Sequence, residues 1–119
     1  MLSLAVYKTI HFLGVFALVT ALTATLARAA QPGGAPDPWR TRLGILHGVA
    51  LFLVLLGGFG MLARLGMGVT GWVGAKLLIW VVAGGLIALR KSAAAAAWGV
   101  VLVPLLAVLA GWIGYTKPF

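Results

Sequence analysis

Four apolar stretches, each long enough to cross a lipid bilayer, constrain this chain more than any other feature of its sequence. A membrane-spanning helix needs about 20 mainly apolar residues, and it satisfies its own backbone hydrogen bonds where no water is present. The stretches cover about residues 2–26, 43–63, 72–89 and 93–115. Because 63% of the residues are hydrophobic and only 8% are charged, a polar surface over a soluble globule is excluded. We therefore predict an all-α fold, an integral membrane four-helix bundle with short loops that forms one transmembrane domain over residues 1–119.

The links between these stretches carry residues that end helices. Residues 29–42 read AAQPGGAPDPWRTR and hold three of the five prolines, so they predict a solvated loop. The second link, LGMGVTG, is rich in glycine, and residues 90–92 leave room only for a hairpin reversal. Within the last stretch, Pro104 is expected to bend the helix or to loosen one turn.

The first stretch has an alternative interpretation as a secretory signal cleaved near Ala29, because small residues follow it in TLARAAQ. Two features favour a retained span. No positive charge precedes Lys8, and the apolar run is longer than the roughly 7–15 residues of a signal core. We therefore expect this stretch to remain as the first helix.

The charged residues restrict both the chemistry and the partners of the chain. Asp37 is the single acid, and there is no cysteine, so paired-carboxylate catalysis, carboxylate metal cages and thiolate sites are excluded. The nine lysines and arginines lie mainly at span ends, where anionic lipid headgroups, rather than nucleic acid, are the expected partners. The side of the membrane with the first and third links has five basic residues: Arg28, Arg40, Arg42, Arg90 and Lys91. The side with the termini has three: Lys8, Arg64 and Lys117. This excess places the links in the cytoplasm and both termini outside it.

Lys76 is the polar residue inside a span that most needs an explanation, since a lysine at a helix centre costs about 2.5–3.5 kcal/mol on insertion scales. Trp72, Lys76 and Trp80 recur every four residues and share one helix face, where cation–π attraction can offset part of that cost. One explanation is that the side chain extends to the membrane surface. The other is a polar pocket with Tyr7 and His11, walled by the two tryptophans, that binds an anionic group.

The two histidines are predicted to lie at different depths. Counted from the middle of each span, His11 is roughly 8 Å towards the terminal side and His47 roughly 9 Å towards the other side. This separation, on the order of 15 Å, prevents both from holding one haem iron. Each remains a candidate metal ligand. For His47, the alternative is a hydrogen bond between helices to Thr20 or Thr23, which lie at its level.

Glycines are expected to bring the helices together, because close packing of small residues drives association in lipid. Gly44 and Gly48 are spaced by four residues on the second span. Packing within the chain is favoured for this pair over a dimerisation contact. Gly14 follows Tyr7 and His11 on the same face and leaves room for a flat ligand or a neighbouring backbone.

Three segments carry a resemblance to known families: YKTIHFLG, LHGVALFLVLLGGFGML and GWVGAKLLIWVVAGGLIALRK. They resemble the SirB-like small four-helix proteins of bacterial membranes and, more distantly, HemJ-type protoporphyrinogen oxidases and CopD-type copper-resistance proteins. The resemblance implies a multi-pass protein of the bacterial inner membrane. The HemJ-type likeness implies haem b, with His11 as an iron ligand and Lys76 facing a substrate carboxylate.

Two functions follow as alternatives. The first is an accessory or structural subunit of a larger membrane complex or homo-oligomer, with a haem or tetrapyrrole pocket formed by His11, His47, Lys76, Tyr7, Trp72 and Trp80. The second is a haem-dependent oxidoreductase of the protoporphyrinogen oxidase type. A transporter is disfavoured because the spans carry no inverted repeat and no carboxylate.

Four spans place both termini on the same side of the membrane. Reporter fusions at Thr116 and within residues 29–42 should therefore give opposite signals for cytoplasmic exposure. Matching signals from the two fusions would contradict a four-span topology.

Overall fold

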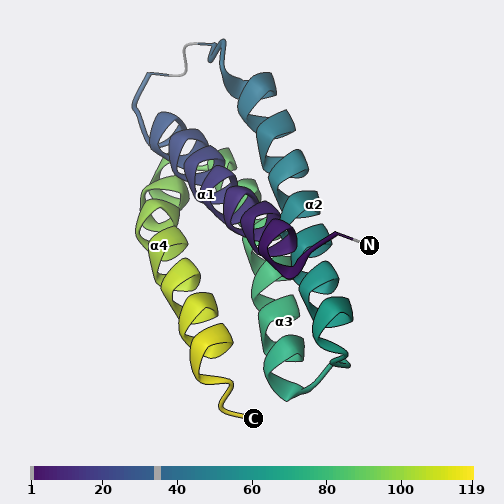
Figure 1. The fold of residues 1–119 in the computed structure, drawn as a ribbon. Coiled ribbons are helices and arrows are strands. Elements are labelled where there is room, and N and C mark those ends of the chain that lie inside the picture. Colours follow the sequence, from purple (N-terminus) through teal and green to yellow (C-terminus); the bar gives the residue numbers. More distant parts are fainter. Residues whose placement is uncertain (1, 34–35) are drawn as a thin grey trace.

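The fold is a set of four long helices, as the sequence predicts (Figure 1). The computed structural model describes residues 2–33 and 36–119. Its elements in chain order are α1 (Leu4–Ala29), α2 (Arg40–Leu65), α3 (Gly71–Gly85), the 3₁₀ helix η1 (Leu86–Lys91) and α4 (Ala93–Thr116). α1, α2, α4 and the continuous α3–η1 segment are each long and apolar enough to cross a membrane.

Local chemistry explains where several helices begin and end. The hydroxyl of Ser3 accepts a hydrogen bond from the backbone of Val6 at the start of α1, and Ser92 caps α4 in the same way, each pairing an otherwise free N–H group. α2 ends at Gly66, whose φ of 65° is a conformation that glycine adopts without strain.

The third span differs from the expected uniform helix over residues 72–89. Its α-helix stops at Gly85, and the chain continues as η1 to Lys91. Gly84 and Gly85 weaken the α-helix at this point, and the tighter 3₁₀ winding leads into the single-residue link at Ser92. α4 runs without interruption through Pro104.

The closest helix contact joins α1 and α2. A Cβ atom at Gly14 would lie 2.7 Å from the backbone nitrogen of Val54, and one at Gly57 would lie 2.5 Å from that of His11. No side chain fits at either position, so the two backbones approach through paired glycines. Gly14 therefore makes room for a neighbouring backbone rather than for a ligand.

Gly44 and Gly48 do not take part in this packing. Within residues 2–33 and 36–119, a Cβ atom at either position would have no neighbour within 4 Å. The expectation that this pair packs within the chain is therefore wrong. The spacing of four residues places both glycines on one face, but the rotation of α2, set by its contact with α1, turns that face away from the other helices.

α1 lies centrally and contributes more buried residues than any other helix. Leu18, Leu22 and Leu26 are buried at four-residue intervals along it, and they pack with Ala50, Ala96 and Val103 of the neighbouring helices. α1 runs at an angle to the other helices, in front of them in Figure 1. The arrangement is flattened, with extents of 51 × 27 × 15 Å.

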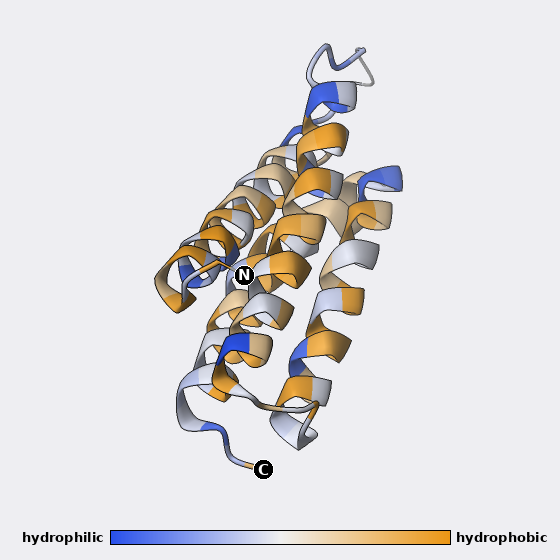
Figure 2. Cartoon of the chain, turned by 45° about the vertical axis from the view of Figure 1, so that its right-hand side comes forward, coloured by the Kyte–Doolittle hydropathy of each residue, from blue (hydrophilic) through white to orange (hydrophobic). Residues whose placement is uncertain are grey.

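The exterior is apolar along the middle of the helices, and hydrophilic residues lie mainly at the helix ends and in the links (Figure 2). The accessible surface is 7139 Å², whereas a compact soluble protein of this mass exposes about 6,100 Å². Phe16, Leu78 and Val108 are among the large hydrophobic side chains that stay mostly exposed. Such a surface needs apolar surroundings.

Replacing Gly57 by leucine should destabilise the fold by about 1–3 kcal/mol or more, because the rigid backbone of α1 cannot make room for the side chain. The same change at Gly44, where the space is open, is the matched control and should preserve stability. The free energy of unfolding in mixed micelles measures both. Equal losses at the two positions would contradict the packing described.

Candidate functional site

His11 connects α1 to α2 through its side chain. Its Nδ1 lies 2.9 Å from the carbonyl oxygen of Val54. A carbonyl oxygen can only accept, so Nδ1 carries the hydrogen and donates it. In the neutral ring this leaves the lone pair on Nε2, the arrangement that backbone carbonyls commonly impose on metal-binding histidines. The bond joins the two helices, and it also leaves one ring nitrogen available.

Tyr7 lies one turn before His11 on the same face of α1. Its ring lies directly against the backbone of Gly60, where no side chain could fit. A Cβ atom at Gly58 would make ordinary contact with the His11 ring, 3.5 Å from Nδ1. The glycines near the end of α2 thus form a notch that receives both ring side chains.

Lys76 extends towards α4. Its Nζ lies 2.8 Å from the position that a Cβ atom would take at Gly114. Lys76 is about 8 Å along α3 from its start, whereas Gly114 is only about 3 Å from the end of α4. The ammonium group is therefore closer to the helix ends than its own backbone, because a long lysine side chain can bury its apolar stem and carry its charge towards a polar boundary.

The predicted group of Tyr7, His11 and Lys76 is only partly brought together. Tyr7 and His11 share the glycine notch of α2, whereas Lys76 extends towards Gly114 of α4. Within the described residues, no hydrogen bond joins Lys76 to either ring. Binding of an anionic group between them stays a prediction.

Trp72 and Trp80, the expected walls of the pocket, make separate contacts. Trp80 donates its indole N–H to the carbonyl oxygen of Leu51 at 3.0 Å and joins α3 to α2. Trp72 faces the ammonium of Lys117, 5.4 Å from the ring centre. Its backbone N–H also binds the carbonyl of Phe119 at 3.0 Å, so the C-terminal segment folds back onto the start of α3.

His47 is buried, with an exposed fraction of 6%. Its Nε2 has no hydrogen-bond partner in the part of the chain that the structure describes. The expected hydrogen bond to Thr20 or Thr23 is not formed, and Thr20 is exposed.

The contacts of the two histidines agree with their predicted separation in depth. His11 lies against Gly57, ten residues along α2 from His47, which corresponds to about 15 Å. Among residues 2–33 and 36–119, no group of three or more histidine, cysteine or acidic residues could hold a metal ion. His11 and His47 are therefore too far apart in depth to hold one haem iron together.

Sequence reasoning missed a basic cavity at the opposite end of the helices. Its volume is about 340 Å³, and it is lined by residues of α1, the first loop, α2 and η1. Arg28, Arg40 and Arg90 contribute the positive charges, and Asp37 contributes the single negative charge. The signal was present in the sequence, since all three arginines lie on the more basic side of the spans.

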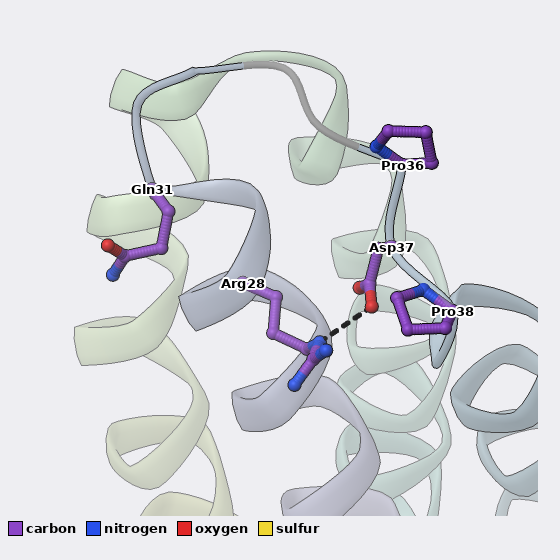
Figure 3. A pocket seen from close by; sticks show the side chains of 5 residues that line it. All are labelled: Arg28, Gln31, Pro36, Asp37 and Pro38. Carbon is purple, nitrogen blue, oxygen red and sulfur yellow. Dashed lines mark hydrogen bonds and ion pairs between the residues drawn. The ribbon is translucent and has the colours of Figure 1, made fainter.

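Asp37 joins the start of α2 to the end of α1 beside this cavity. Its Oδ1 accepts a hydrogen bond from the backbone N–H of Trp39 at 2.9 Å and pairs with Nε of Arg28 at 2.8 Å. Figure 3 shows the Arg28 side chain directed at Asp37 beside Pro36 and Pro38. The Trp39 N–H and the Arg28 guanidinium hold the pKa of the Asp37 carboxyl below its ordinary value, so the pair stays charged at neutral pH.

The comparisons with known proteins assign no family. No protein-family model matches the chain, and no curated protein or solved structure matches it.

Proposed function

We propose that this chain is a small multi-pass protein of the bacterial inner membrane that serves as an accessory or structural subunit of a larger membrane assembly. Four apolar helices and a mostly apolar exterior support the membrane location. The observation that carries the subunit role is the uncovered pair Gly44 and Gly48 on α2. In membranes, small residues four apart mark the surface at which another helix packs closely.

The interior of the chain supports a structural role over catalysis. Trp80 and one nitrogen of the His11 ring are used in hydrogen bonds between helices. Such bonds hold apolar helices in register where the hydrophobic effect cannot. At Gly44 and Gly48, by contrast, an added Cβ atom would meet no other described residue within 4 Å.

Replacing Gly48 by leucine should dissociate the assembly while the chain itself remains folded. Leucine favours the helix more than glycine does, so a loss of assembly cannot come from a weakened α2. The measurement is the size of gently solubilised native membrane complexes that contain the tagged chain. Val49→Leu is the matched control, since Val49 is also exposed. Migration of the parent chain as a monomer would contradict the proposal.

Haem binding through His11 is a second candidate, favoured by the orientation of that ring. Because Nδ1 donates to Val54, Nε2 would be the iron ligand, and Lys76 would pair with a tetrapyrrole carboxylate. A bound haem would supply a redox-active iron, as an oxidoreductase of the HemJ type requires. The protein residues would hold and orient it.

Addition of haem b to the purified chain should then give a Soret band typical of a single histidine ligand. His11→Gln should abolish the band while keeping an amide that can donate to Val54, so that the contact between helices is preserved. His47→Gln is the control and should leave the spectrum unchanged. An identical spectrum for His11→Gln and the parent would reject His11 as the ligand.

A further inference from the structure

We propose that the basic cavity at the loop end of the helices binds a phosphate group, with Arg40 and Arg90 as its cationic ligands and Thr25 as a buried hydroxyl donor. The phosphate is that of an anionic lipid headgroup or a free phosphate ion. This inference is independent of the subunit role and of haem binding. The cavity lies at the opposite end of the helices from His11, and neither Gly44 nor Gly48 lines it.

The first argument is the charge of the cavity. Three arginines from separate elements, the end of α1, the start of α2 and η1, line one space of about 340 Å³. Asp37 is the only acidic side chain of the whole sequence, and it is already bound to Arg28 at 2.8 Å. Arg90 therefore has no carboxylate side chain left to pair with. Guanidinium groups bind phosphate oxygens in paired hydrogen bonds, which suits them to such a ligand.

The second argument is Thr25, which also lines the cavity. Its exposed fraction is 5%, and its hydroxyl has no hydrogen-bond partner among the described residues. A threonine in a helix commonly donates to the carbonyl four residues earlier, yet Thr25 does not. A buried hydroxyl without a partner is costly, and rotation of the Thr25 side chain about its Cα–Cβ bond would let the hydroxyl bind an oxygen-rich ligand in the cavity.

The third argument is depth. Thr25 and Arg28 lie in the last two turns of α1, and Arg40 begins α2. If these helices cross a bilayer, their ends lie at the level of the headgroups, and basic pockets between helices at that level bind anionic headgroups. The apolar helices directly below offer a surface for acyl chains. A lipid thus provides both the phosphate and the apolar part of the contact.

The test uses the full chain purified in a neutral detergent. Native mass spectrometry measures the retention of phosphatidylglycerol and of phosphatidylcholine, and equilibrium dialysis measures the binding of inorganic phosphate. Preferential retention of phosphatidylglycerol without phosphate binding identifies a lipid headgroup. Saturable phosphate binding that competes with the lipid identifies the free ion as a ligand. Absence of both a lipid preference and phosphate binding would overturn the proposal.

Arg90→Gln should weaken the binding about tenfold, the effect of losing one charge-assisted hydrogen bond. Lys91→Gln is the matched control, because it removes the same charge from the next residue, which does not line the cavity. Thr25→Val removes only the hydroxyl and should also weaken binding. Circular dichroism checks that each variant remains helical. Equal losses for Arg90→Gln and Lys91→Gln would show a diffuse charge effect and reject the site.

Discussion

The close approach of the α1 and α2 backbones is the constraint on which the remaining structure depends. Gly14 and Gly57 allow it, since any side chain at either position would meet backbone atoms of the other helix. Once the two helices are held this closely, the ring of His11 reaches Val54. The same approach turns Leu18, Leu22 and Leu26 towards the core. α1 thereby becomes the element around which the others are arranged.

Polar groups decide how the apolar helices are kept in register. A hydrogen bond between helices gives direction that packing of leucine and valine does not. His11 and Trp80 each bind a backbone carbonyl of α2, from α1 and α3 respectively. Thr25 and His47 are buried without such partners. The hydrogen-bonded groups stabilise the fold. A buried polar group without a partner beside a cavity, as at Thr25, marks a place where a bound ligand would add to this stability.

The imbalance between nine basic residues and one acid shapes both ends of the molecule. At the loop end, Asp37 pairs with Arg28 and leaves Arg40 and Arg90 around an open cavity. At the other end, Lys76 extends to α4, where Gly114 leaves room for its ammonium group. Lys117 lies over the aromatic ring of Trp72. A chain that cannot neutralise its cations internally depends on anions in its surroundings.

The four helices and their approximate ends could be predicted from the sequence, because hydropathy and the proline- and glycine-rich links act locally. The different depths of His11 and His47 could be predicted as well, since the rise per residue of a helix is fixed. The rotation of each helix was decided only by tertiary packing. Gly44 and Gly48 have the same spacing whether they face inward or outward, so the spacing does not show which of the two orientations the helix adopts. The direction of the Lys76 side chain and the meeting of Arg28, Arg40, Arg90 and Thr25 around one cavity likewise depend on contacts between distant segments, which no local pattern encodes.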